Sequence, residues 1–138
     1  MVEPAMIYID GASRGNPGPA GAGVIAVDAQ GKALVRLSKY VGETTNNVAE
    51  YLALVYALLE ACARGWRHVM IRTDSELVAR QFTGQYHVRD GTLRLFHDLA
   101  RHLAGHFERC TVEHVPREQN RQADRLAREA VKSRVASS

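Results

Sequence analysis

The feature that most constrains the fold is an apolar run of strand length that ends in a carboxylate. The run Met6–Ile9 shows no polar alternation, as expected for a strand that is buried on both faces. Asp10 follows at once, and then comes a segment rich in glycine, proline and small residues, G-A-S-R-G-N-P-G-P-A-G-A-G. Because open α/β sheets usually build their sites at strand ends, Asp10 is predicted to lie at the rim of a site. An Asp-Gly turn is the alternative interpretation.

The glycine-rich segment does not match the common phosphate-binding loops. It lacks the Gly-Lys-Ser/Thr ending of a P-loop, Pro17 and Pro19 remove two backbone N–H donors, and no G-x-G-x-x-G opens a helix. The segment can still let the backbone approach a ligand closely, with Asn16 offering an amide to a phosphate or a sugar. A tight hairpin connection into the next strand is the other interpretation, and the two are compatible.

Length and composition predict a single domain over residues 1–138. The chain is 46% apolar and 24% charged, and a chain of this length buries about two thirds of the surface that it exposes when unfolded. Only three of the 18 basic residues are lysine, and arginine suits bidentate phosphate contacts. The net charge of +3 therefore leans towards an anionic partner such as nucleic acid, although it is also ordinary for a soluble protein.

The two cysteines and the distribution of apolar residues bear on location. Cys62 and Cys110 have no C-x-x-C spacing and are interpreted as small buried hydrophobes in a reducing compartment. No apolar run approaches the ~18 residues of a membrane helix, and no signal-peptide pattern is present at the N-terminus. We expect a cytoplasmic monomer that does not bind membranes.

Hydrophobic periodicity and turn residues predict five strands and four helices. The strands are expected at Met6–Ile9, Gly23–Val27, Ala33–Tyr40, His68–Thr73 and Thr111–Val115. The helices are expected from the caps at 44–47 as far as Gly65, and at Ser75–Phe82, 93–103 and Gln119–Val131, with a frayed tail over Lys132–Ser138. The order β-β-β-α-β-α-α-β-α predicts an α/β fold with a mixed sheet, three antiparallel strands then two parallel strands, flanked by helices.

Two acidic residues close apolar strands. If the strands that end in Asp10 and Asp74 are neighbours in the sheet, their carboxylates emerge side by side. Two carboxylates held close repel each other unless a proton or a cation lies between them. Each position also has a simpler explanation, because Asp10 can start a turn and Asp74 can cap the helix that begins at Ser75.

Two further acidic residues lie in the first turns of predicted helices. Glu50 follows Asn47 by three residues, and on spacing alone a capping box is the favoured interpretation. The functional interpretation is that Glu50 points down to the strand ends. Asp124 lies beside the apolar face of the last helix, although the start of a helix favours an acid in any case.

Taken together, the four acids form a set of oxygen ligands without His or Cys. Such a set suits Mg²⁺ or Mn²⁺ rather than zinc. Two such ions about 3.5 to 4 Å apart would clamp a phosphodiester between an attacking water and the leaving oxygen. The sequence therefore indicates the chemistry of a nuclease.

Four segments resemble the successive motifs of type 1 ribonuclease H, in the order of that family. They are Y-I-D-G-A-S-R-G-N-P-G-P-A-G, T-T-N-N-V-A-E-Y-L-A-L, I-R-T-D-S-E-L-V and V-P-R-E-Q-N-R-Q-A-D-R-L-A, and they span residue 8 to about residue 130. The resemblance implies the ribonuclease H-like fold. It also implies hydrolysis of the RNA strand of RNA/DNA hybrids, with 5′-phosphate and 3′-hydroxyl ends.

The resemblance also implies roles for individual residues. The metal-binding catalytic carboxylates would be Asp10, Glu50, Asp74 and Asp124, with Asp10 bridging two Mg²⁺ or Mn²⁺ ions. The residues in contact with the hybrid would be Gly11, Asn16, Asn46, Asn47 and Glu76. Such contacts reach sugars and phosphates, and the 2′-hydroxyl distinguishes RNA from DNA, so sequence readout is not expected.

The chain departs from the best-studied bacterial pattern in two places. Between Gly84 and Leu95 there is no long Lys-rich insertion, so hybrid binding is expected to be weaker or more sensitive to salt. The loop Pro116–Gln119 is short, where some members carry a mobile histidine. His114 at the preceding strand end and Arg117 in the loop are therefore kept as auxiliary catalytic candidates.

Two other functions remain possible from the sequence. A nucleic-acid-binding module could keep this fold without catalysis, but the presence of all four acids argues against it. An integrase or transposase core that acts on DNA could share the fold, but the Asn-Asn and Gly-Asn-Pro-Gly motifs favour the hybrid.

Overall fold

A computed structural model describes residues 3–4 and 6–137 of the chain. Its centre is a five-stranded sheet with the order β3-β2-β1-β4-β5. The strands are β1 (Met6–Ser13), β2 (Gly18–Val27), β3 (Ala33–Thr44), β4 (His68–Thr73) and β5 (Arg109–His114). β1 to β3 pair antiparallel, and β1, β4 and β5 pair parallel. The predicted mixed α/β sheet is confirmed.

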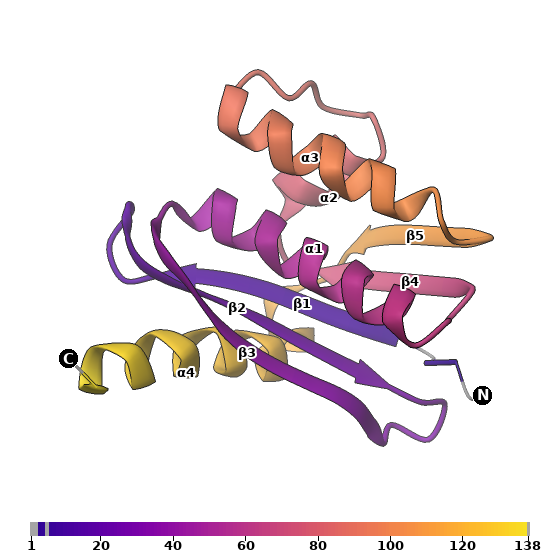
Figure 1. Ribbon diagram of the computed structural model, residues 1–138, viewed down its shortest axis with the longest axis horizontal. Coiled ribbons are helices and arrows are strands. Elements are labelled where there is room, and N and C mark those ends of the chain that lie inside the picture. Colours follow the sequence, from indigo (N-terminus) through magenta and orange to yellow (C-terminus); the bar gives the residue numbers. More distant parts are fainter. Residues whose placement is uncertain (1–2, 5, 138) are drawn as a thin grey trace.

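Helices cover both faces of the sheet. They are α1 (Asn46–Ala63), α2 (Glu76–Phe82), α3 (Gly91–Ala104), the single 3₁₀ turn η1 (Arg117–Gln119) and α4 (Arg121–Ser137). Figure 1 shows α1, α2 and α3 on one face and α4 alone on the other, below β2 and β3. The core lies mainly between α1 and the sheet, and its largest fully buried side chains include Tyr51, Ile7, Ile9, Leu54 and Leu58.

The first strand is longer than the sequence analysis predicts. β1 continues through Asp10 to Ser13, because β2 remains its antiparallel partner as far as the pair Ser13 and Ala20. The prediction that the strand ends at Asp10 is therefore wrong. What ends there is the parallel pairing with β4, whose last pair is Ile9 with Thr73. Asp10 thus lies where one edge of β1 becomes free.

Part of the predicted glycine-rich loop is strand. β2 begins at Gly18 rather than Gly23, and two of its glycines, Gly21 and Gly23, lie directly against α4. A Cβ added at Gly21 would lie 2.2 Å from the carbonyl oxygen of Ala127, and one at Gly23 would lie 2.1 Å from that of Ala123. No side chain fits in these gaps. The glycines therefore allow the backbone of α4 to pack against β2, and only 14–17 form the turn between β1 and β2.

Other element boundaries differ by a few residues. β3 extends four residues beyond Tyr40, and β5 is shifted two residues towards the N-terminus at its start. α4 continues past Val131 to Ser137, so its last two turns cover most of the segment expected to fray. Fraying of that segment stays a prediction, and Ser138 lies outside the described residues.

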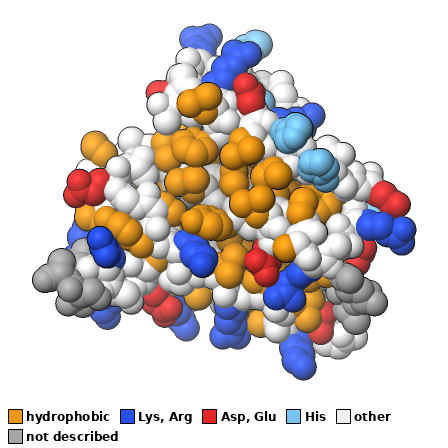
Figure 2. Space-filling model, in the orientation of Figure 1, with side chains coloured by type: hydrophobic (Ala, Val, Ile, Leu, Met, Phe, Trp, Pro, Cys, Tyr) orange, Lys and Arg blue, Asp and Glu red, His pale blue; other side chains and the backbone are white. Residues whose placement is uncertain are grey.

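One face of the molecule carries many apolar side chains. Figure 2 shows them gathered over α1 and α3. The exposed large apolar residues of these two helices are Leu59 on α1 and Leu95 and Leu99 on α3. Within the residues that the structure describes, no helix is both long enough and apolar enough to cross a bilayer.

Candidate active site

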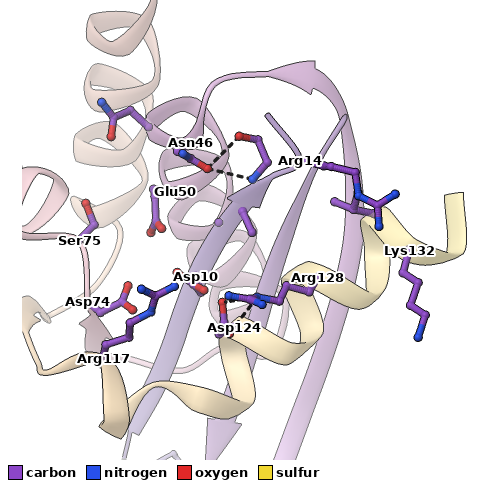
Figure 3. Close-up of a pocket in the computed structure, with 15 residues that line it drawn as sticks. Asp10, Arg14, Asn46, Glu50, Asp74, Ser75, Arg117, Asp124, Arg128 and Lys132 are labelled. Atoms are coloured by element: carbon purple, nitrogen blue, oxygen red, sulfur yellow. Dashed lines mark hydrogen bonds and ion pairs between the residues drawn. The ribbon is translucent and has the colours of Figure 1, made fainter. Parts of the chain in front are cut away.

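Three carboxylates converge where β1 separates from β4. Oxygen atoms of Asp10, Glu50 and Asp74 all lie within 4.8 Å of one another. They come from the middle of β1, the first turns of α1 and the residue that follows β4. Figure 3 shows the three side chains pointing into one cavity. The acids predicted to meet there are 24 to 64 positions apart in the sequence.

The sheet register places Asp10 beside Asp74. Ile9 is the parallel partner of Thr73, and each of these two residues is followed by an aspartate, Asp10 or Asp74. Beyond this pair the two chains diverge, because Ser75 caps α2 by accepting a hydrogen bond from the backbone N–H of Val78. The alternative that Asp74 caps this helix is therefore wrong.

Close packing at Gly11 brings Glu50 to the two aspartates. A Cβ added at Gly11 would lie 2.3 Å from both the carbonyl carbon of Ala49 and the backbone nitrogen of Glu50. α1 therefore crosses β1 closer than any side chain would allow. The N-cap of α1 is Thr45, whose hydroxyl accepts from the N–H of Val48. The capping box of Asn47 with Glu50, favoured on spacing, is wrong.

The cluster raises the pKa values of its own buried acids. Burial raises the pKa of Asp10 far above its usual value, and the negative charges of Glu50 and Asp74 add to this effect. Burial also raises the pKa of Glu50, while hydrogen bonds from Asp10 and from the Gly11 backbone oppose the rise. Three carboxylates in this arrangement need protons or cations to offset their mutual repulsion.

The donor set fits a hard divalent cation. All ligand atoms are carboxylate oxygens, which Mg²⁺ and Mn²⁺ prefer. Oε2 of Glu50 is buried and has no hydrogen-bond partner among the described residues. A buried carboxylate oxygen without a partner is costly unless a ligand satisfies it. The cluster is therefore suited to a metal ion.

Asp124 reaches the same cavity from the opposite face of the sheet. Its carboxylate lines the cavity but does not belong to the group of three within 4.8 Å. Arg128, one turn further along α4, holds it through contacts of 3.1 and 3.2 Å. A side-chain hydrogen bond with Asp124 also contributes to the raised pKa of Asp10, after burial and the charges of Glu50 and Asp74. Three of the four predicted acids thus form one cluster, with the fourth at its margin.

An asparagine network forms the wall beside Glu50. Oδ1 of Asn46 accepts hydrogen bonds of 2.9 and 2.8 Å from the backbone N–H and hydroxyl of Ser13. Oδ1 of Asn16 in turn accepts a hydrogen bond of 3.0 Å from the backbone N–H of Asn46, the first residue of α1. The side-chain carbonyls are thereby used within the protein. The NH₂ groups of Asn16 and Asn46 make no hydrogen bond within the described part of the chain, so they remain available as donors.

The cavity has a volume of about 780 Å³. Of the remaining predicted residues, Gly11, Asn46, Asn47 and Arg117 line it. Asn16, Glu76 and His114 do not line it. Glu76 accepts a hydrogen bond of 3.3 Å from the hydroxyl of Tyr86, and His114 is exposed at the end of β5.

Sequence reasoning missed several lining residues. Ser13 and Ser75 lie next to predicted site residues, whereas Arg14, Arg128 and Lys132 add positive charge to the wall. A signal for two of them was present, because Asp124, Arg128 and Lys132 follow at four-residue steps and therefore share one helix face. Lys132 was instead assigned to a frayed tail.

A second hollow, of about 680 Å³, lies between α2, the following loop and α3. Its lining includes Tyr86, His87, Arg89 and Arg94, the residues of the segment that stands in place of the Lys-rich insertion. A small hollow lined in part by basic residues therefore takes the place of a long Lys-rich insertion.

Comparisons with known proteins show which proteins the chain resembles. Residues 8–130 match the family described as reverse transcriptase-like. The chain is 44% identical over 124 residues to the ribonuclease HI of Halobacterium salinarum, covering 90% of this chain and 62% of that protein. It is 41% identical over 127 residues to the bifunctional protein Rv2228c of Mycobacterium tuberculosis, covering 91% of this chain and only 35% of that protein.

A solved structure shows the same fold. The ribonuclease H1 LC11, isolated from compost and crystallised in complex with an RNA/DNA hybrid, is 42% identical, with a TM-score of 0.90 over 94% of this chain and 98% of that one. The chain spans less than two thirds of the two curated relatives. The family match nevertheless covers most of this chain. The chain therefore belongs to the type 1 ribonuclease H family, in a compact form without the long Lys-rich insertion between Gly84 and Leu95.

Proposed function

We propose that this protein is an endoribonuclease that hydrolyses the RNA strand of RNA/DNA hybrids. The observation that carries the proposal is the convergence of Asp10, Glu50 and Asp74 within 4.8 Å at the wall of a large open cavity. The hybrid bound to the LC11 relative supports the same class of substrate here.

The carboxylates of Asp10, Glu50, Asp74 and Asp124 would hold two Mg²⁺ or Mn²⁺ ions. When bound, such ions supply charge neutralisation at the scissile phosphate and a water of lowered pKa. Attack of water on that phosphate, with departure of the 3′-oxygen, gives the 5′-phosphate and 3′-hydroxyl ends. The unpartnered oxygen of Glu50 supports this assignment, since a ligand would satisfy it.

Other residues in and near the cavity wall would position the hybrid rather than react with it. The free amide donors of Asn16 and Asn46 suit 2′-hydroxyl and phosphate oxygens, and Gly11 lines the cavity beside Asp10. Asn47 and Glu76 would extend these contacts along the duplex. None of these groups reads base edges, so cleavage is expected to be insensitive to sequence.

Arg117 and His114 are proposed as auxiliaries. Arg117 lines the cavity and can neutralise charge on a phosphate. His114 is the last residue of β5 and does not line the cavity. A role for it in proton transfer would require a substrate that extends beyond the cavity.

We further propose that the chain acts as one monomeric domain in the cytoplasm. The single sheet with helices on both faces supports one domain. The free thiols of Cys62 and Cys110 suit a reducing compartment.

The decisive experiment compares labelled RNA/DNA, RNA/RNA and DNA/DNA duplexes with Mg²⁺ or Mn²⁺ and with EDTA. We expect cleavage of the RNA in the hybrid only with metal, and end-group analysis showing 5′-phosphates. Asp10→Asn and Asp74→Asn should each abolish cleavage while hybrid binding survives. A binding module would bind the hybrid in all conditions without cutting it, and retained cleavage in either variant would refute the assigned roles.

A further inference from the structure

The main cavity has two ends of opposite charge. One end holds the cluster of Asp10, Glu50 and Asp74. The wall on the α4 side carries Arg14 and Lys132, and Figure 3 shows both on the far side of Arg128 from the cluster. All of these residues line the same continuous cavity. A ligand that spans it would therefore meet a divalent-metal site at one end and positive side chains at the other.

The helical rise of α4 gives the distance along the cavity wall from Asp124, at the margin of the acidic cluster, to Lys132. Asp124, Arg128 and Lys132 recur every four residues, and each step rises about 6 Å along the helix. Lys132 therefore lies about 12 Å along the helix axis from Asp124. Consecutive nucleotides of one strand rise about 3.4 Å along a duplex, so this distance corresponds to about three to four nucleotides.

The charges at the far end are not neutralised by the protein. Many of the arginines have carboxylate partners, as Arg64 does in Glu60 and Arg72 does in Glu113. Arg128 itself is paired with Asp124. In contrast, Arg14 and Lys132 are exposed and have no ion-pair partner within the residues that the structure describes. Two unpaired cations that line a shared cavity are suited to an anion.

We propose that Arg14 and Lys132 form a subsite for a backbone phosphate of the RNA strand, about three to four nucleotides from the cleaved bond. The RNA strand is favoured because the cavity is continuous with the carboxylates that would hold the scissile phosphate. This inference rests on the proposed function, because it takes the acidic cluster as the position of the cleaved bond. The subsite would supply part of the hybrid affinity that a Lys-rich insertion supplies in other members.

The first test is a charge-matched pair of double variants. Arg14→Gln with Lys132→Gln removes the subsite. Lys32→Gln with Arg109→Gln removes the same charge from residues that flank strand ends remote from Asp10 and Asp74. We expect the first pair to raise KM for the hybrid about five- to thirtyfold with kcat unchanged. The control pair should change KM less than about twofold.

Binding separates this proposal from the proposed function. Hybrid affinity measured by fluorescence anisotropy in the Asp10→Asn background should show a salt slope lower by about one in the Arg14 and Lys132 variant. If the wild-type protein does not cleave hybrid, the proposed function fails, and the same slope measured in the wild-type background still tests the anion site. An affinity and slope equal to those of the control pair would overturn the subsite even if cleavage is normal.

A neutral-phosphate scan identifies the strand. Hybrids carry one methylphosphonate at successive positions, either in the RNA strand or in the DNA strand. At one RNA position near the cleaved bond, the wild-type protein should lose as much affinity as the double variant, and the double variant should lose nothing more. The same signature at a DNA position would overturn the assignment to the RNA strand, and its absence at every position would overturn the subsite.

Discussion

The side-chain amide of Asn120 donates a hydrogen bond of 2.8 Å to the backbone carbonyl oxygen of Ile9. Asn120 is 1% exposed and lies just before α4, whereas Ile9 precedes Asp10 on β1. The bond therefore joins the segment that carries Asp124 to the strand that carries Asp10. Such a contact can fix the spacing of Asp10 and Asp124 from a position outside the cavity.

Replacement of Asn120 by Ala should lower the free energy of unfolding by about 1 to 3 kcal/mol. The variant loses this buried hydrogen bond and leaves a space where the side chain of Asn120 was. Urea unfolding monitored by circular dichroism measures the change. Gln122→Ala, at an exposed position on the same helix, is the control and should lie within about 0.5 kcal/mol of the wild-type protein. Equal stability of both variants would contradict a structural role for this bond.

Glycine-to-alanine variants should separate close packing from simple flexibility. Gly23→Ala would place its Cβ 2.1 Å from the carbonyl oxygen of Ala123, so α4 must move away from β2. We expect a loss of about 3 kcal/mol or more in the free energy of unfolding. At Gly91 no atom lies within 4 Å of the added Cβ, so Gly91→Ala should be neutral or slightly stabilising. Thermal unfolding of the two variants in parallel would test this, and similar melting temperatures would argue against the packing explanation.

Without metal, the stability of the protein should fall as the pH rises above about 4. Burial and neighbouring acids raise the pKa of Asp10 in the folded state, so the folded protein keeps a proton that the unfolded chain releases. The favourable contribution is complete below the unfolded pKa and is lost as the pH rises towards the folded one. Urea unfolding in EDTA at pH 5 and pH 8 would measure this.

The Asp10→Asn variant should remove the loss of stability that ionisation of Asp10 causes at high pH. Asparagine cannot ionise, so the metal-free variant should be more stable than the metal-free wild-type protein at pH 8, by on the order of 1 to 3 kcal/mol. The difference should shrink at pH 5, where the wild-type side chain is protonated in the folded state and partly so in the unfolded chain. A variant that is less stable than the wild-type protein at both pH values would show that Asp10 is not electrostatically strained.

Addition of Mg²⁺ or Mn²⁺ should raise the melting temperature of the EDTA-treated protein, and more so at pH 8 than at pH 6. Cations bind deprotonated carboxylates, so protons on the buried acids compete with them. Differential scanning fluorimetry over a metal titration measures the shift. Glu50→Gln should reduce it strongly, whereas Glu129→Gln, at an exposed position of α4 outside the cavity lining, should not. An equal shift in both variants would point to nonspecific binding.

Much of the fold could be predicted from local patterns. The strand His68–Thr73 was located to the residue, and α2 to within one residue, because short apolar runs and polar helix starts are local signals. The expected start Ser75 is the N-cap, and the cap suggested at Asp74 was wrong. The order of strands and helices then determined which strands could be parallel. The four acids were found for the same reason, since each stands at the end or start of a predicted element.

The boundaries around the glycines were not predictable in this way. Gly18–Ala22 reads as a loop, because glycine is rare in strands. It is strand here because α4 packs onto Gly21 and Gly23, and that contact joins residues about 100 positions apart. The positive end of the cavity was missed for a related reason, since Arg14 and Lys132 come from the two ends of the chain.

The sequence by itself determined which residues are candidates for the chemistry, because oxygen ligands, strand ends and helix caps are properties of residue type and short spacing. Only the tertiary structure decided that Asp10, Glu50 and Asp74 share one site while Asp124 is held beside it by Arg128. The register of β1 with β4 and the absence of a side chain at Gly11 set those distances. Such long-range contacts depend on backbone packing, which no local pattern encodes.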